Sequence, residues 1–119
     1  MLIRSQDKET LANMEGPIVI EILSDDNGHS IMYWKDNGYV LGFYSSKEKA
    51  IKVLDMIQEA YMDFEASKIT STGLATAAYT GSYDTPESVA GGIKVLKGYT
   101  KTIRESMAFQ MPEDSEVEV

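Results

Sequence analysis

The chain has 119 residues and no cysteine, which suits a single domain without disulfides, thiolate nucleophiles or thiolate zinc sites. Its formal net charge is -8, so it lacks the positive surface on which binding to duplex nucleic acid depends. Its apolar runs are too short to span a bilayer and its first residues (MLIRSQDKE) are too polar for a secretory signal, so we expect a cytoplasmic protein with no membrane partner.

The N-terminal third of the chain predicts an antiparallel β-meander. Short apolar and β-branched segments alternate with turn-forming residues, as is typical of successive strands. The three main strands are expected at residues 17–23 (PIVIEIL), 30–35 (SIMYWK) and 39–44 (YVLGFY). The first of these carries only one charge, Glu21, and is therefore expected to be largely buried. Two shorter strands are expected before it, at residues 2–6 and 10–13.

Two Asn-Gly dipeptides separate the main strands, Asn27-Gly28 and Asn37-Gly38. Both residue types tolerate positive φ, so this dipeptide favours the type I′ turn of a tight β-hairpin. Two copies one strand apart therefore predict two successive hairpins.

A helix is expected to follow over residues 46–65. Ser45 and Glu48 have the spacing of a capping box, which predicts where the helix begins. Apolar residues then recur every three or four positions while charged residues cover the other side. We expect this helix to lay its apolar stripe on one face of the sheet.

The chain beyond this helix is less regular. Residues 67–84 (SKITSTGLATAAYTGSYD) are rich in Ser, Thr, Gly and Ala, and we interpret them as a long loop. Residues 108–112 (AFQMP) are expected to form a last strand. Residues 113–119 (EDSEVEV) read as a solvated acidic tail, outside a single domain that spans residues 1–112.

A second helix is favoured over residues 88–106. Thr85, Pro86 and Glu87 form a typical helix start, with a capping side chain, a proline in the first turn and an acid near the positive end of the helix dipole. Gly91-Gly92 weakens this helix by roughly 1 kcal/mol for each glycine relative to alanine. A strand over residues 92–100 remains the alternative.

This segment carries the best candidate ligand site. As a helix it presents four basic side chains on one face, at spacings of three, four and three. Such a stripe suits a phosphate group, and nearby tyrosines could stack on a nucleobase. The candidate ligand-binding residues are Lys94, Lys97, Lys101, Arg104, Tyr79, Tyr83 and Tyr99. The alternative is an ordinary solvated face whose charges pair with neighbouring acids such as Asp84, Glu87 and Glu105.

The residues offer little for catalysis. The single histidine, His29, follows a turn and has Asp25 and Asp26 close in sequence, but an exposed hairpin residue is the simpler interpretation. The acids have no spacing typical of a cation loop. We therefore expect no enzymatic activity, no metal and no cofactor.

Aromatic residues gather on the last two strands of the predicted meander, and their alternation sends some to each face. They are Tyr33, Trp34, Tyr39, Phe43 and Tyr44. If the sheet has a second apolar face, self-association would cover it, so we expect a homo-oligomer.

Three segments of the chain resemble a family of small uncharacterised proteins found in phages and prophages of Gram-positive bacteria. They are residues 3–8 (IRSQDK), residues 41–58 (LGFYSSKEKAIKVLDMIQ) and residues 109–114 (FQMPED). The resemblance implies an accessory protein that works in the bacterial cytoplasm. Small phage accessory proteins include anti-defence sponges that sequester cyclic nucleotide signals, and the link to these is analogy only.

The sequence thus predicts an α+β fold, with an antiparallel meander packed by one amphipathic helix and a C-terminal helix or strand pair. The expected function is non-enzymatic binding of a phosphorylated or nucleotide-like ligand. The alternative is an inhibitor or assembly module that binds a host protein and no small ligand.

Overall fold

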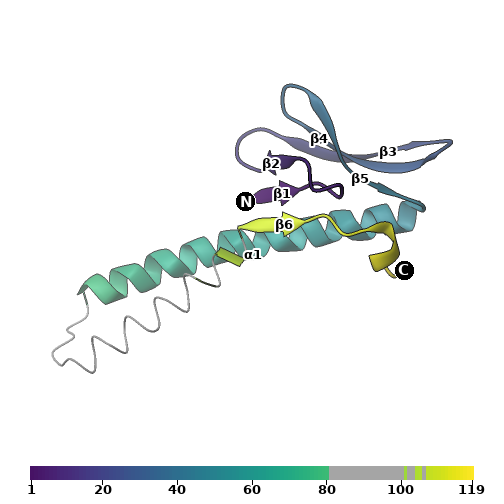
Figure 1. Ribbon diagram of the computed structural model, residues 1–119. Helices are drawn as coiled ribbons and strands as arrows, with labels where there is room; N and C mark the ends of the chain where they lie inside the picture. Colours follow the sequence, from purple (N-terminus) through teal and green to yellow (C-terminus); the bar gives the residue numbers. More distant parts are fainter. Residues whose placement is uncertain (81–100, 102–103, 106) are drawn as a thin grey trace. The chain divides into compact units, whose positions relative to one another are not determined.

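The computed structural model describes residues 1–80, 101, 104–105 and 107–119 (Figure 1). The chain forms two compact units, one made of residues 1–61 with 108–119 and the other of residues 62–107. The first unit holds both sheets, and the predicted α+β fold is confirmed. No helix among the described residues is both long enough and apolar enough to cross a membrane.

The first sheet joins the two ends of the chain. Its strands are β1 (Leu2–Arg4), β2 (Leu11–Asn13) and β6 (Ala108–Gln110), in the order β2-β1-β6. β1 pairs with β2 antiparallel and with β6 parallel. The short strands expected near residues 2–6, 10–13 and 108–112 are therefore confirmed.

The second sheet is the predicted meander. Its strands are β3 (Val19–Asp25), β4 (Gly28–Trp34) and β5 (Gly38–Tyr44), in the order β3-β4-β5 with antiparallel pairing throughout. The register between β4 and β5 shifts after Ile31, which leaves Leu41 as an extra residue on β5. Leu41 and Gly42 are consecutive and both buried, as the bulge allows.

The two hairpins form as predicted, but the predicted type I′ turns are wrong. Neither Asn27 nor Asn37 has positive φ, and the only non-glycine residue of the described chain that does is Lys8. At the first turn the Asp25 carboxylate accepts hydrogen bonds from the backbone N–H groups of Asn27 and Gly28, at 2.8 and 3.1 Å. This side-chain bond replaces the backbone geometry that Asn-Gly favours.

The expected burial of the first main strand is also wrong. Val19 and Leu23 of β3 are 56% and 45% exposed, and the rest of the strand is half-buried or exposed. These side chains are exposed because β3 lies at the edge of its sheet. The hydrophobic composition of a strand does not predict whether the strand lies at the edge or in the centre.

The helix α1 (Lys47–Thr80) begins where predicted but continues far beyond Glu65. The Ser46 hydroxyl accepts a hydrogen bond from the Lys49 N–H at 3.2 Å, so the capping residue is Ser46 rather than Ser45. The long loop predicted at residues 67–84 is wrong over residues 67–80, and residues 81–84 lie outside the described chain. This stretch contains alanines and no proline, so its small polar residues lower helix propensity without ending the helix.

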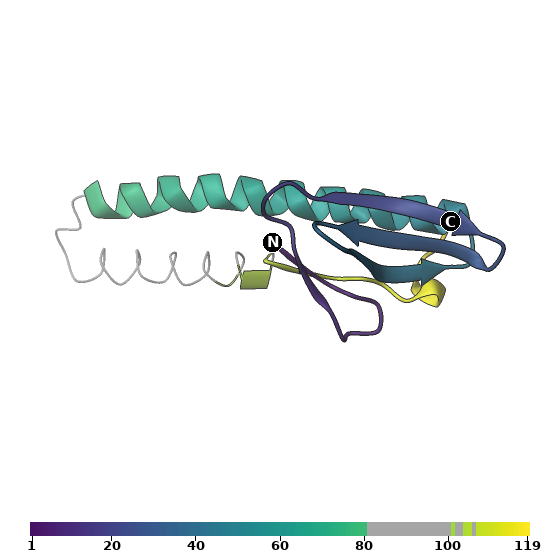
Figure 2. The ribbon, with the colours of Figure 1, turned by 90° about the horizontal axis from the view of Figure 1, so that it is seen from above.

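The core of the first unit lies between the meander and the start of α1. The sheet lies over this part of the helix in both views (Figures 1 and 2). The strands contribute Ile31, Tyr33, Leu41 and Tyr44, and the helix contributes Ala50, Val53 and Ile57. The three-four spacing of the helical residues is the rhythm that predicted this packing.

The predicted solvated tail at residues 113–119 is wrong. The chain there turns through a short 3-10 helix, η1 (Asp114–Glu116), and buries Val117 to 5% exposure. The Lys52 ammonium donates a hydrogen bond to the Glu118 carbonyl. Four acids in seven residues suggested solvation, but valine at position 117 supplies an apolar anchor.

Candidate functional site

One face of the meander is left uncovered by the part of the chain that the structure describes. Cross-strand pairing places Val19 opposite Trp34, and Met32 opposite Val40, on the side away from the core residues Ile31 and Tyr33. We call this side the outer face. Its apolar members are Val19, Leu23, Met32, Trp34, Val40 and Phe43. All of these except the half-buried Met32 are between 38% and 56% exposed.

Two glycines hold the aromatic rings of the outer face in place. A Cβ atom on Gly38 would lie 2.5 Å from Cζ3 of Trp34, and one on Gly28 would overlap the Phe43 ring. Each ring therefore lies across a glycine of the neighbouring strand, in space that any side chain would fill. This packing fixes two large apolar side chains on the surface instead of letting them fold into the core.

A shallow groove lies beside β2 and the turn between β4 and β5. Its volume is about 410 Å³, and it is lined by Thr10, Leu11, Ala12, Asn13, Tyr33, Lys35, Asp36, Asn37 and Tyr39. The Tyr33 hydroxyl donates to the Asn13 carbonyl at 2.6 Å and is therefore already used. The rings of Tyr33 and Tyr39 pack against each other, with centroids 6.4 Å apart, so a nucleobase could not stack between them. Lys35 lies beside Asp36, so the groove has no surplus of positive charge to hold phosphate.

The predicted basic stripe lies mostly outside the described chain. Lys94, Lys97, Tyr83 and Tyr99 are not among the described residues, and Tyr79 is described only as part of the α1 backbone. The favoured helix at residues 88–106 is therefore described only at residues 101, 104 and 105.

Lys101 and Arg104 are helical and exposed. The Lys101 ammonium lies 4.0 Å from the Glu105 carboxylate, and both side chains are well exposed. An exposed pair of this kind contributes at most about 1 kcal/mol to stability. It is the kind of pairing expected of a solvated face, and it leaves both groups accessible.

His29 lies within β4, opposite Ser24 of β3. Its Nδ1 atom is 2.7 Å from the Ser24 hydroxyl. A serine-histidine contact alone does not activate the hydroxyl, since a nucleophile also needs an oriented base and donors for the developing oxyanion. The Asp25 carboxylate bonds the turn backbone instead. Within the described residues, no group of three or more His, Asp and Glu side chains could hold a metal ion.

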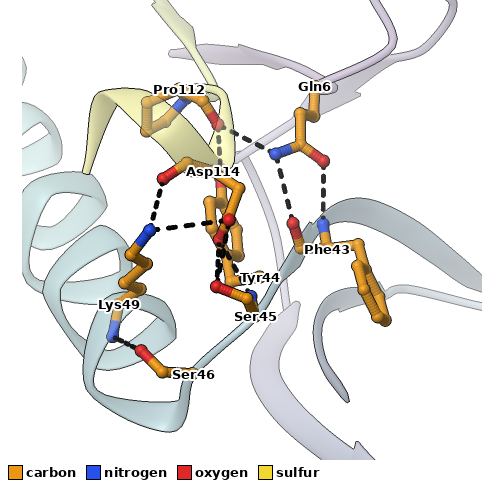
Figure 3. Close-up of polar contacts among 8 residues, drawn as sticks. All are labelled: Gln6, Phe43, Tyr44, Ser45, Ser46, Lys49, Pro112 and Asp114. Atoms are coloured by element: carbon orange, nitrogen blue, oxygen red, sulfur yellow. Dashed lines mark hydrogen bonds and ion pairs between the residues drawn. The ribbon is translucent and has the colours of Figure 1, made fainter. Parts of the chain in front are cut away.

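The C-terminal segment is tied to β5 and to the start of α1 by a polar cluster that sequence analysis missed (Figure 3). We call it the C-terminal clasp, made of Gln6, Phe43, Tyr44, Ser45, Lys49, Pro112 and Asp114. The Asp114 carboxylate accepts from the Ser45 N–H at 2.8 Å and from the Ser45 hydroxyl at 3.0 Å. It also lies 3.5 Å from the Lys49 ammonium, which donates to the Asp114 carbonyl at 2.9 Å.

Gln6 forms the other half of the clasp. Its amide oxygen accepts from the Phe43 N–H at 2.9 Å, and its amide nitrogen donates to the carbonyls of Phe43 and Pro112 at 3.2 and 3.1 Å. The buried Tyr44 hydroxyl also donates to the Pro112 carbonyl, at 2.8 Å. The clasp thus joins three distant parts of the chain through hydrogen bonds.

The clasp shifts two titratable groups in opposite directions. The Ser45 N–H and hydroxyl, with the Lys49 charge, lower the pKa of Asp114. Burial raises the pKa of Tyr44, and the neighbouring Glu113, Asp114 and Glu116 raise it further. Hydrogen bonds from Ser5 and Glu9 lower the pKa of Asp7 in the loop after β1. These shifts keep the clasp in one charge state near neutral pH, which suits a structural role rather than proton transfer.

The residues of the clasp come from three stretches that are far apart in the sequence, namely residues 3–8, 41–58 and 109–114. Gln6, Tyr44 and Asp114 hold the fold together and are not placed to hold a ligand. No local pattern in the sequence pointed to them, because their hydrogen bonds join distant parts of the chain.

Comparison of the chain with models of protein families, with curated proteins and with solved structures finds no match.

Proposed function

We propose that this chain is a non-enzymatic accessory protein that binds another protein through the outer face. One observation carries the proposal, namely the row of exposed apolar side chains on a sheet whose opposite face packs on α1. Together these side chains expose on the order of 400 Å² of apolar surface, which is the size of the largest patch on a typical monomer, and such patches are often functional.

The composition of the outer face supports protein binding over small-molecule binding. It displays Trp34 and Phe43, residue types that are enriched at the centres of protein interfaces. Glu21 is the only charged residue among the central positions of this face. The resemblance to phage and prophage proteins suggests the context, in which the partner would be a host protein and binding would inhibit it or recruit it to an assembly.

Glutamate substitution tests the outer face directly. Val40 is 54% exposed on β5, and Leu11, which is 61% exposed on β2, provides a control outside the outer face. We expect Val40→Glu to abolish capture of a specific protein from lysate of a Gram-positive host, and Leu11→Glu to retain it. A titration of the purified partner should then show the same order of affinity. Capture that survives Val40→Glu, or that is lost equally in both variants, contradicts the proposal.

The second candidate function is sequestration of a phosphorylated or cyclic-nucleotide signal. Lys101 and Arg104 favour it, because both are exposed and lie three positions apart on helical backbone. We expect the thermal melt of the chain to rise with a cyclic dinucleotide if this function is correct. Arg104→Ala should remove that rise without lowering the melt of the free protein by more than a few degrees. No rise with any phosphorylated nucleotide would exclude this candidate and leave the outer face as the proposed site.

A further inference from the structure

One edge of the meander has no neighbouring strand among the described residues. The strand at this edge is β3, which has the apolar, β-branched composition of a central strand. β3 is the first strand in the order β3-β4-β5, so only one side of its backbone pairs with a neighbour among the described residues. The opposite edge of the sheet, at β5, is tied by Gln6 to the C-terminal clasp. Among the described residues, β3 is therefore the edge of this sheet that is open to another strand.

β3 has few of the features that usually protect an edge. Edge strands are commonly short, bulged, or interrupted by proline or charge. β3 pairs with β4 over seven consecutive positions without a register shift. It contains no proline, and Glu21 is its only charge before Asp25 at the very end. Val19 and Leu23 remain exposed on one face, while Ile20 and Ile22 remain half-buried on the other.

We propose that β3 pairs antiparallel with β3 of a second copy, about a two-fold axis at Ile22. This register places Ile22 opposite its own counterpart, Glu21 opposite Leu23, and Ile20 opposite Ser24. No carboxylate then faces another. The registers centred one position to either side place Glu21 opposite Glu21 or opposite Asp25, and directly opposed like charges destabilise a sheet.

The self-complementarity of this strand is the reason to choose a second copy as the occupant. A two-fold pairing uses the same seven residues twice, which is the isologous interface that most homodimers adopt. It would join the two meanders into one continuous six-stranded sheet. The outer faces of both copies would then lie side by side as one larger apolar surface.

The net charge sets the conditions under which the pair forms. Each copy carries -8, so long-range repulsion opposes association in dilute salt. The strand contact itself is apolar and backbone-mediated. The dimer should therefore tighten as salt is added, whereas a contact held by ion pairs would weaken.

The experiment measures the solution mass of the full chain by sedimentation across protein and salt concentration. We expect a species of twice the 13.2 kDa monomer mass, more populated at higher salt. Leu23→Glu places a carboxylate opposite Glu21 of the partner at two symmetric positions and should give a monomer. Val40→Glu adds the same charge to the same face on β5, away from the edge, and should stay dimeric.

A charge reversal tests the register. The double variant Glu21→Lys/Leu23→Glu sets lysine opposite glutamate at both positions of the proposed pairing, and it should restore the dimer. In the register centred on position 21 it would instead oppose two lysines. If Leu23→Glu fails to fold by circular dichroism, amide exchange in the wild-type chain gives the same answer, since residues 19–25 should gain protection with concentration while β5 does not.

The outcomes separate this proposal from the proposed function. A wild-type chain that stays monomeric, a dimeric Leu23→Glu variant, or a Val40→Glu variant that also loses the dimer would each overturn edge pairing. Loss of host-protein capture in Val40→Glu with the dimer intact supports both proposals. Retained capture in a dimeric Val40→Glu variant rejects only the outer face as the binding site.

Discussion

The side-chain amide of Gln6 and the carbonyl of Pro112 are 106 positions apart in the sequence and 3.1 Å apart in the structure. The same amide group satisfies both the N–H and the carbonyl of Phe43. One side chain thus links the loop after β1, the strand β5 and the segment that follows β6.

Replacing this side chain should loosen the C-terminal clasp. Gln6→Ala removes three hydrogen bonds, each worth about 1 kcal/mol, although water can satisfy part of the freed backbone. We expect the free energy of unfolding to fall by about 1–2 kcal/mol in urea titrations. Asn13→Ala, which removes a single exposed side-chain bond to Glu15, is the control and should cost less. Equal losses in both variants would show that Gln6 does not hold the clasp.

Asp114 should make stability depend on pH in the acid range. Its pKa is lowered in the folded state, so its contribution is complete above the usual aspartate value of 3.8 and disappears as pH falls through the lower folded-state pKa. The difference in unfolding free energy between wild type and Asp114→Asn should therefore be largest near neutral pH and shrink below pH 4. Comparing the two proteins cancels the similar contribution of Asp7.

The control for this pH series is Asp36→Asn. The Asp36 carboxylate is exposed in the turn between β4 and β5 and makes no hydrogen bond or ion pair with the described residues. A difference from wild type that stays constant from neutral pH to pH 2 for Asp114→Asn would contradict the assigned role of this carboxylate.

Val117 should behave as a core residue despite its place among acids. It is 5% exposed, whereas Val119, two positions later, is 73% exposed. We expect Val117→Ala to lower the free energy of unfolding by about 1–2 kcal/mol and Val119→Ala to change it by less than about 0.5 kcal/mol. Indistinguishable thermal melts for the two variants would contradict the burial of Val117 and show that residues 113–119 form a solvated tail, as their composition suggests.

Gly38 should resist substitution only while Trp34 is present. A methyl group there would lie 2.5 Å from Cζ3 of the indole, so Gly38→Ala should displace the ring and cost about 1–3 kcal/mol. Trp34 is the only tryptophan, so its fluorescence should shift in the same variant. In a Trp34→Ala background the same substitution should cost nothing, because φ at Gly38 is not positive.

These features mark the boundary between what sequence could predict and what it could not. The strands β3 to β5 and the start of α1 follow from local patterns, namely alternation, Asn-Gly turns and a three-four rhythm. The edge position of β3 does not, because a strand's composition carries no information on which neighbours it acquires. The C-terminal clasp was also invisible, since its bonds join residues such as Ser45 and Asp114 that no local period relates.

The length of α1 and the candidate ligand site were also predicted only in part from the sequence. Residues 67–80 have weak helical propensity, and the context of a helix already begun outweighs the loop that their composition suggested. Of the basic stripe, only Lys101 and Arg104 belong to the described residues. Both are helical and exposed, and their role in ligand binding stays a prediction. The aromatic residues that alternate along β4 and β5 indicated that the sheet could have a second apolar face, but they did not predict which residues form it.

The parallel pairing of β1 with β6 has a consequence for synthesis on the ribosome. β1 emerges first and cannot complete its sheet until β6 has emerged, whereas the hairpins of β3 to β5 need only contacts between neighbours in the chain. The meander can therefore form before β6 and the C-terminal residues of the clasp have been translated. A nascent chain would display the β3 edge and the outer face before the clasp closes, so chains made on one messenger could meet while they are still being translated.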